Sequence, residues 1–214
     1  MKLMHFSYLF IAATLGLATL LVAEYGWHKG WWHGEGARKL AHICIGVQVA
    51  IWPLYLSWFE IRIISIALAI GFVVSMKRRW FKSIGSVSRL SYGEVLFALM
   101  IGALTLVTQS PAIYAAAMLH LSLADGAAAL IGLRWGRMNT YRVFGHTKSV
   151  AGTMAFFVTS VGILVAYSLF SIGGLSWHLI VMGALGASFL ENIGILGLDN
   201  LLVPAFVVAL LTLT

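Results

Sequence analysis

Hydrophobic and polar positions along this chain alternate in long blocks: extended apolar runs are separated by short polar joints. About 20 apolar residues in helical form cross the roughly 30 Å hydrocarbon core of a bilayer. Only a helix satisfies its own backbone hydrogen bonds in lipid at that run length, so each run predicts a transmembrane helix. Eight spans are predicted, near residues 5–23, 40–58, 61–76, 93–108, 111–133, 149–170, 176–192 and 198–213.

Seven or nine spans are alternatives to the predicted eight. The third, seventh and eighth runs are short or interrupted by polar residues, and only a few residues around Glu60 and Arg62 separate the second run from the third. Composition supports the class: of 214 residues, 61% are hydrophobic and 10% are charged, which predicts an all-α, polytopic transmembrane helix bundle. The single cysteine, Cys44, excludes a disulfide framework within the chain.

No soluble domain or internal repeat is visible, so residues 1–214 are predicted to form a single integral membrane domain. Within it, residues 1–36 would supply a first anchor helix and a loop, and residues 37–214 the bundle that carries the candidate chemistry. The first run, with Lys2 before it and Ala23 at its end, could instead be a secretory signal peptide. Removing it would move the basic cluster between Lys77 and Arg89 to the opposite side of the membrane, so charge favours the anchor.

With eight spans, all of the 14 basic residues except Lys2 and Arg62 lie on one side of the membrane. The positive-inside rule makes that side the cytoplasm and places both termini outside. Six of the seven acidic residues lie in cytoplasmic loops or in the cytoplasmic halves of helices, namely Glu24, Glu35, Glu94, Asp125, Glu191 and Asp199.

Asp125 lies inside an apolar run. It comes nine residues before Arg134, which at 1.5 Å per residue is about 13 Å below the loop. A carboxylate at that depth costs roughly 2.5 to 3.5 kcal/mol, so it is expected to face the bundle and to have a partner. A structural ion pair and a functional acid are both open. The small residues that follow it, beginning with Gly126, would let a helix or a ligand approach the backbone closely.

Several donors suited to phosphate oxygens lie near this acid. The loop after the fifth span supplies Arg134, Arg137, Arg142, His146 and Lys148, and the start of the second span supplies Arg38, Lys39 and His42. Arg38 and His42 are four residues apart and share a helix face, whereas Lys39 is turned by about 100°. Topogenic positive charge is the alternative for any one of these cations.

The remaining polar positions have structural explanations beside functional ones. Ser91 and Glu94 have capping-box spacing, and Asp199 is a natural N-cap for the last helix. Glu191 and Asn200 lie close to the same joint between the last two spans. Motifs of P-loop kinases, zinc proteases and serine hydrolases do not occur. Carboxylates beneath many cations suit a magnesium-bound nucleotide, because Mg²⁺ prefers oxygen ligands and phosphates bind Arg and Lys.

Five segments in this order resemble the polyprenol kinase family of CTP-dependent lipid kinases, which includes dolichol kinase, phytol kinase and CTP-dependent diacylglycerol kinases. They are "RKLAHICIG" at 38–46, "SYGEVLFAL" at 91–99, "LADGAAALIGLRWG" at 123–136, "GHTKSVAGTMAFF" at 145–157 and "ENIGILGLDNLLVP" at 191–204. The resemblance implies transfer of the γ-phosphate of CTP to a membrane lipid alcohol such as phytol, a polyprenol or diacylglycerol.

The resemblance and the charges of the residues together predict roles for individual residues. Asp125 and either Glu191 or Asp199 would hold Mg²⁺, and Asp125 or His42 would take the proton of the lipid hydroxyl. Glu94 and Asn200 would complete the site. The nucleotide would be bound by Arg38, Lys39, Gly126, Arg137, His146, Lys148 and Ser149. Two other functions stay open: a cytidylyltransferase that makes CDP-diacylglycerol, which would release pyrophosphate rather than CDP, and a small transporter with Asp125 on an ion path.

Overall fold

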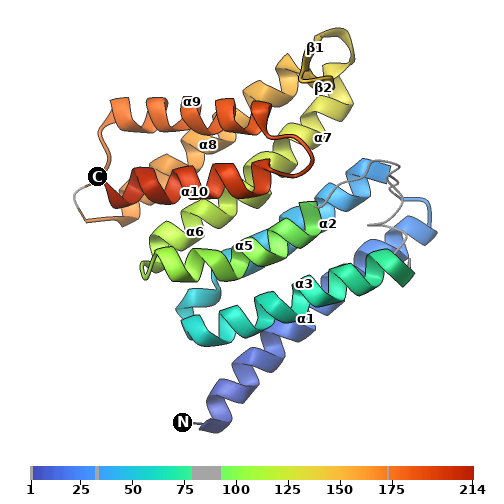
Figure 1. The fold of residues 1–214 in the computed structure, drawn as a ribbon, viewed down its shortest axis with the longest axis vertical. Coiled ribbons are helices and arrows are strands. Elements are labelled where there is room, and N and C mark those ends of the chain that lie inside the picture. The colour runs from blue at the N-terminus through green and yellow to red at the C-terminus, as the bar shows by residue number, and fades with distance from the viewer. Residues whose placement is uncertain (1, 32–33, 79–92, 173) are drawn as a thin grey trace.

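The computed structural model describes residues 2–31, 34–78, 93–172 and 174–214 (Figure 1). Helices dominate these ranges, as the apolar runs predict, and the all-α fold class is confirmed. The α-helices are α1 (Lys2–His28), α2 (Gly34–Ala50), α3 (Trp58–Arg78), α5 (Gly93–Val107), α6 (Pro111–Leu119), α7 (Asp125–Trp135), α8 (Val150–Phe170), α9 (Trp177–Ile193) and α10 (Asp199–Thr212).

Shorter elements join these helices. A π-helical turn at His120–Ala124 continues α6 into α7, so that the two form one long rod with a local widening. Such π-turns occur often at functional sites. Two 3₁₀ turns, Trp52–Leu54 and Gly136–Met138, follow α2 and α7. A hairpin of β1 (Thr140–Val143) and β2 (His146–Ser149) precedes α8.

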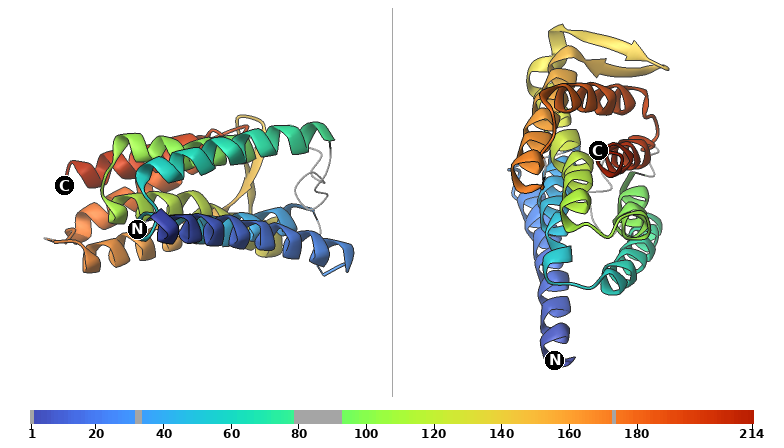
Figure 2. Two further views of the ribbon diagram at one scale, coloured as in Figure 1. Left: turned by 90° about the horizontal axis from the view of Figure 1, so that it is seen from below. Right: turned by 90° about the vertical axis from the view of Figure 1, so that its left-hand side faces the viewer.

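The bundle brings the predicted cytoplasmic joints to one end. Figure 1 shows the C-terminal ends of α1, α3, α7 and α9 at the right, beside the N-terminal ends of α2, α5, α8 and α10. The hairpin lies at the same end, and the chain termini lie toward the other (Figure 1). In Figure 2, α1 and α2 run side by side, and α3 and α5 form a second adjacent pair. Residues that are distant in sequence, but near polar joints, therefore meet at one end of the bundle.

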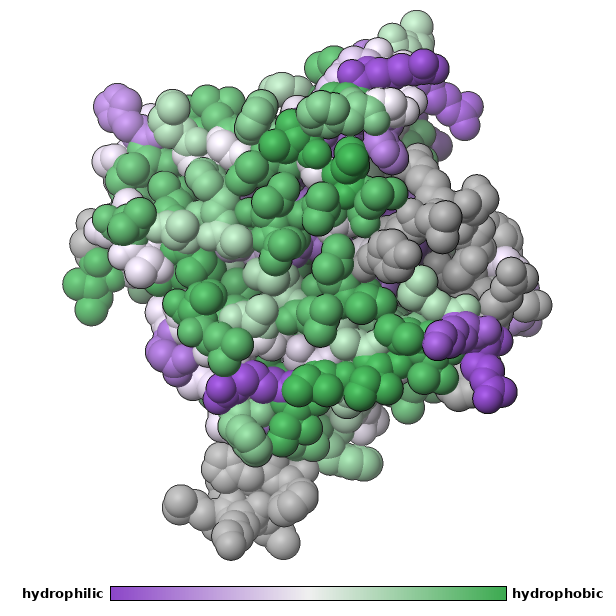
Figure 3. All heavy atoms as spheres, viewed as in Figure 1, coloured by the Kyte–Doolittle hydropathy of each residue, from purple (hydrophilic) through white to green (hydrophobic). Residues whose placement is uncertain are grey.

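The surface agrees with a membrane environment. Figure 3 shows a broad hydrophobic face, with hydrophilic side chains at its margins. Within the described residues, four helices are long and apolar enough to cross a membrane: Ser7–His28, Trp58–Arg78, Pro111–Met138 and Val150–Phe170. Gly93–Val107 and Asp199–Thr212 are shorter apolar helices. The chain is thus a membrane protein, and eight crossings remain a prediction.

The second predicted span, 40–58, is wrong as a single helix. The helix α2 begins earlier, at Gly34, and ends at Ala50, before a 3₁₀ turn that contains Pro53. The helix α3 then begins with a capping box: the carboxylate of Glu60 accepts from the Ser57 backbone N–H at 2.7 Å, and the Glu60 N–H donates to Ser57 Oγ at 3.3 Å. The hydropathy pattern does not reveal where α2 ends, because apolar residues continue from α2 through the 3₁₀ turn.

The hairpin is also absent from the predicted elements, in which 134–148 is a polar loop. Its strands pair Tyr141 with Lys148 and Val143 with His146, and it turns through Gly145 at φ +81°. Glycine adopts that backbone conformation without steric cost. Directly opposed residues point to the same face of a hairpin. Tyr141 and Lys148 therefore extend together toward α9.

Candidate active site

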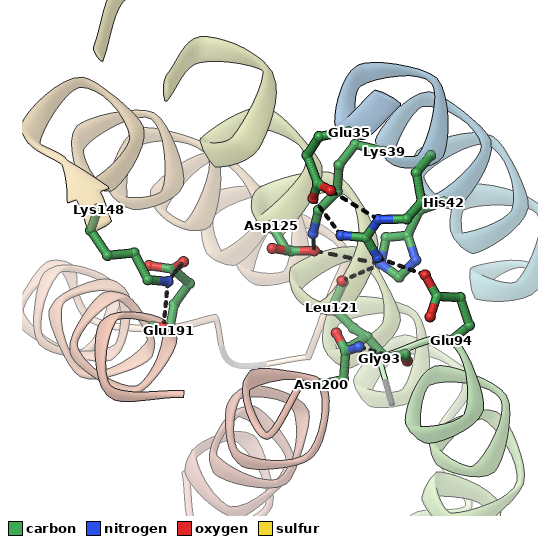
Figure 4. Close-up of polar contacts among 11 residues, drawn as sticks. Glu35, Lys39, His42, Gly93, Glu94, Leu121, Asp125, Lys148, Glu191 and Asn200 are labelled. Atoms are coloured by element: carbon green, nitrogen blue, oxygen red, sulfur yellow. Dashed lines mark hydrogen bonds and ion pairs between the residues drawn. The ribbon is translucent and has the colours of Figure 1, made fainter. Parts of the chain in front are cut away.

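Asp125 is the first residue of α7, immediately after the π-turn. It is buried, with 7% of its surface exposed. Its carboxylate forms an ion pair with Lys39 of α2, which is also buried. The Nε2 atom of His42, one helical turn beyond Lys39, lies 3.6 Å from Asp125 Oδ2. Two residues of α2 therefore reach the same intramembrane acid (Figure 4).

The ring of His42 has a defined tautomer. Its Nε2 atom lies 2.9 Å from the backbone oxygen of Leu121, and a carbonyl oxygen can only accept, so Nε2 carries the hydrogen. In the neutral ring, Nδ1 then has a free lone pair. The ring packs against Phe97 of α5 with a centroid distance of 4.4 Å. His42 consequently lies between Asp125 on one side and α5 on the other.

Arg38 contacts acids on two elements. Its guanidinium pairs with Glu35 within α2 and donates from Nη1 to Glu94 Oε1 of α5 at 2.8 Å. The adjacent cations Arg38 and Lys39 thus separate: Lys39 binds Asp125, and Arg38 binds Glu35 and Glu94. Ser91, the proposed capping partner of Glu94, lies outside the described residues.

A second lysine–carboxylate pair joins the hairpin to α9. Lys148 of β2 forms an ion pair with Glu191 and also donates to the Glu191 backbone oxygen at 3.0 Å. Beside it, the Tyr141 hydroxyl contacts Asn192 and Thr153. These contacts fix the hairpin against the ends of α8 and α9, and so position the ammonium of Lys148 over a buried carboxylate.

The carboxylates of Asp125 and Glu191 line one small pocket, which the surrounding side chains nearly fill. Its walls come from the π-turn, α7, α8, α9 and α10, and are formed by His120, Leu121, Asp125, Phe156, Glu191, Asp199, Asn200 and Val203. The charges of Asp125, Lys39, Lys148 and Glu191 all act on Asp199. Three acids from segments far apart in sequence therefore line one pocket, and a lysine pairs with each of two of them, Asp125 and Glu191.

The start of α10 differs from the predicted cap. Asp199 is the first helical residue, and Leu198 takes the N-cap position without a side-chain hydrogen bond. Asn200, one residue later, donates from Nδ2 to the backbone oxygen of Gly93 at 2.8 Å. This bond ties α10 to the start of α5. It thereby positions Glu94 and Phe97 relative to the pocket.

The described residues contain no group of three or more His, Cys, Asp or Glu side chains arranged to hold a metal ion. Magnesium in nucleotide enzymes is usually held by one or two carboxylates together with substrate phosphates and water, rather than by a complete protein cage. Asp125 and Glu191, each paired with a lysine at the pocket, fit that kind of site. Asp199 lies at the same pocket as a third oxygen donor.

Four other predicted site residues have visible structural positions. A Cβ added to Gly126 would overlap the side chain of Ile43, so this glycine lets α2 and α7 pack closely. Ser149 caps α8, because its hydroxyl accepts from the Gly152 N–H at 3.1 Å. Arg137 is exposed on the 3₁₀ turn, and His146 is half-buried on β2. Their roles in nucleotide binding stay predictions.

His120 is a residue of the pocket that the sequence motifs do not single out. Its Nδ1 atom donates to the Ala116 carbonyl at 2.8 Å, so Nε2 accepts from the hydroxyl of Ser160 on α8, also at 2.8 Å. The fully buried ring thus anchors the π-turn that presents Asp125. One signal was available in the sequence: a histidine inside an apolar run, which is expensive unless it has a partner.

One comparison shows a known protein that is similar to this chain over most of its length. No family model matches the chain, and no solved structure matches it. A curated phytol kinase from Synechocystis sp. is 35% identical over 202 residues, which cover 91% of this chain and 85% of the relative.

The buried polar pocket at one end of a membrane helix bundle, together with this match, defines a phosphotransferase that acts on an alcohol group. The chain belongs to the polyprenol kinase family, as the five sequence segments indicate. An enzyme of this class is a kinase, so the transporter and the cytidylyltransferase are no longer needed to explain the buried acids.

Proposed function

We propose that this protein transfers the γ-phosphate of CTP to a lipid alcohol at the cytoplasmic face of a membrane, with Mg²⁺ as its metal ion. The observation that carries the proposal is the pair of lysine–carboxylate contacts, Lys39–Asp125 and Lys148–Glu191, whose acids are buried and line one pocket. Phytol is the first acceptor to test because the curated relative is a phytol kinase. Polyprenols and diacylglycerol are the alternatives within the family.

Each lysine has a role in both states of the site. Without nucleotide, Lys39 and Lys148 neutralise Asp125 and Glu191, since a buried carboxylate without a partner is costly. With nucleotide, the same ammonium groups and Arg38 are available to the phosphate oxygens, and the carboxylates face the metal. Asp125, with Glu191 or Asp199, would hold Mg²⁺. The ion would neutralise charge on the β- and γ-phosphates.

The chemical step is an in-line phosphoryl transfer. The lipid hydroxyl oxygen forms a bond to the γ-phosphorus, and the bond from that phosphorus to the oxygen bridging to the β-phosphate breaks, which releases CDP. The hydroxyl proton passes to a base of the site. Two candidates lie within 3.6 Å of each other: the carboxylate of Asp125 and the ring of His42, whose Nδ1 has a free lone pair.

Charge supports the orientation. The joints at the active-site end carry nearly all of the basic residues, and Lys and Arg are enriched in cytoplasmic loops. A cytoplasmic site would also have direct access to nucleotide, while the acceptor would arrive from the bilayer. Cysteine labelling at the hairpin in intact and permeabilised cells tests this orientation independently of activity.

The deciding experiment uses the purified protein in lipid nanodiscs with γ-labelled CTP and Mg²⁺. Phytol, a polyprenol and diacylglycerol are offered separately, and ATP replaces CTP in a parallel series. We expect label in the lipid product, stoichiometric CDP, and loss of the reaction when EDTA removes the metal. Release of pyrophosphate, or equal use of ATP, would contradict the proposed reaction.

A further inference from the structure

A groove lies on the side of His42 that faces away from the pocket of Asp125. It runs between α1, α2, α3 and α5, and its cavity volume is about 30 Å³. Its lining is formed by Leu20, Arg38, Ala41, His42, Ile45, Phe72, Glu94 and Phe97. A cavity of this size holds a small polar group such as a hydroxyl rather than a whole ligand.

The groove is polar at one end and apolar along the rest. Arg38 and Glu94, joined at 2.8 Å, lie at the starts of α2 and α5. Ala41 and Ile45 follow one and two turns further into α2, and Phe97 follows one turn into α5. A molecule that fills the groove would therefore have its polar group at the active-site end of the bundle and its apolar part in the membrane.

A single side chain, that of His42, lies between the groove and the proposed site. The ring of His42 lines the groove, packs against Phe97, and has its Nε2 atom 3.6 Å from Asp125 Oδ2. A hydroxyl held beside His42 would be separated from Asp125 by little more than the imidazole. Figure 4 shows Arg38's partner Glu94, His42 and Asp125 converging in this region.

The apolar end of the groove is next to surfaces that face lipid. Around Leu20 and Phe72, the helices α1 and α3 present exposed apolar side chains, namely Leu17, Leu21, Val73 and Val74. A chain that left the groove between these helices would enter the bilayer without crossing water. Apolar surface of this kind is expected where a lipid tail or the bilayer covers it.

We propose that this groove is the acceptor site, and that it takes the hydroxyl-bearing end of a lipid alcohol with a single apolar chain. The inference rests on the proposed lipid kinase function and adds the position and the shape of the acceptor. At roughly 10–15 Å³ for a group the size of a water molecule, the volume of about 30 Å³ holds the hydroxyl and little more. The chain that bears the hydroxyl would leave the groove past Leu20 and Phe72, whereas a glycerol would bring two chains to the same opening.

Photo-crosslinking tests the site without relying on turnover. The probe is a farnesol analogue with a diazirine close to the hydroxyl, added to the full-length protein in phosphatidylcholine nanodiscs. We expect label on α2 and α5, suppressed by excess phytol and not by excess diacylglycerol. Label spread over the exposed faces of α8 and α9, or label that phytol does not displace, would overturn the assignment and leave the groove as a position for ordinary membrane lipid.

A matched pair of substitutions tests the shape. Ala41 is buried in the groove wall and Ala18 is exposed on α1. We expect Ala41→Leu to raise the KM for phytol about tenfold, because overfilling a packed site weakens binding by a factor of that order. The KM for CTP should stay unchanged, and Ala18→Leu should behave as wild type. An active Ala41→Leu protein with an unchanged KM for phytol would refute the groove.

A second substitution covers the case in which Ala41→Leu does not fold. Phe72 is half-buried at the membrane end of the groove, and Phe72→Ala widens it. We expect turnover of diacylglycerol relative to phytol to rise; an unchanged ratio would contradict the inference. The two proposals fail differently. Wild-type protein that never phosphorylates an alcohol with CTP refutes the proposed function, whereas active protein with unchanged selectivity refutes only the acceptor site.

Discussion

The two lysine–carboxylate pairs have the same chemistry but different supports. Lys39 and Asp125 both lie on helices inside the bundle, and each side chain is 10% exposed. Lys148 lies on a hairpin strand and is 22% exposed, and its partner Glu191 is 8% exposed. Lys39 is therefore expected to leave its acid less readily than Lys148, because Lys148 has a long side chain nearer the surface.

This difference suggests that the two pairs have different roles. The Lys39–Asp125 pair is held by close helix packing, with Gly126 against Ile43 beside it, so it is expected to determine both stability and catalysis. The Lys148–Glu191 pair is held by a hairpin fixed through Tyr141, so it is expected to affect nucleotide binding more than folding. Substitutions at each pair can separate these contributions.

The largest effect is expected for Asp125→Asn. Phosphorylation of the lipid should fall below detection, because the variant lacks the carboxylate proposed to hold Mg²⁺. Stability should also fall by about 3 kcal/mol, since removing one partner leaves the buried ammonium of Lys39 unpaired. Activity with labelled CTP and thermal unfolding in nanodiscs measure the two effects.

The double variant Asp125→Asn with Lys39→Met is the control for this result. It removes both charges, so most of the lost stability should return while activity stays absent. Recovery of activity in the double variant would show that Asp125 has only a structural role as the counter-ion of Lys39. Wild-type activity in Asp125→Asn alone would likewise show that Asp125 has no catalytic role.

A smaller effect is expected for Lys148→Met. We predict an increase in the KM for CTP of about tenfold, corresponding to one lost charge-assisted contact of roughly 1.4 kcal/mol. The KM for the lipid should not change. Arg142 lies exposed on the other strand of the same hairpin, so Arg142→Met removes an equal charge as a matched control. Equal loss of affinity in both variants would indicate general attraction of nucleotide rather than a specific contact.

The sequence predicted the helices well wherever an apolar run ended at a polar joint, but not where the run continued through a boundary. The end of α2 and the start of α3 are set by Pro53 and the Ser57–Glu60 box inside apolar sequence. The hairpin is short and polar, so hydropathy had no signal for it. Its position depends on contacts between Tyr141 and distant residues of α8 and α9.

The site residues were visible in the sequence because charge within or beside an apolar run is costly. Their partners were not, because pairing depends on which helices become neighbours. Helical angles turned Lys39 away from Arg38, and the structure agrees, but residues three apart also share a face. Lys39 and His42 consequently reach Asp125 together, whereas Arg38 reaches Glu94. Helix geometry predicted in which direction each side chain of α2 points. The packing of the helices determined which acid each cation pairs with.

The smallest effect on chemistry is expected for Gly46→Ala, which tests whether the packing around Asp125 can be loosened without removing a charged group. A Cβ on Gly46 of α2 would overlap the side chain of Ser122 in the π-turn, so this change should cost about 1–3 kcal/mol of stability. A Cβ added to Gly16 of α1 would meet no atom within 4 Å, and Gly16→Ala should be neutral or stabilise by up to about 1 kcal/mol. If Gly46→Ala lowers thermal stability but retains kcat, the Asp125 end of the site tolerates small shifts of the π-turn. A collapse of kcat at unchanged stability would instead mean that the position of this turn, and not only its charge, is part of the catalytic geometry.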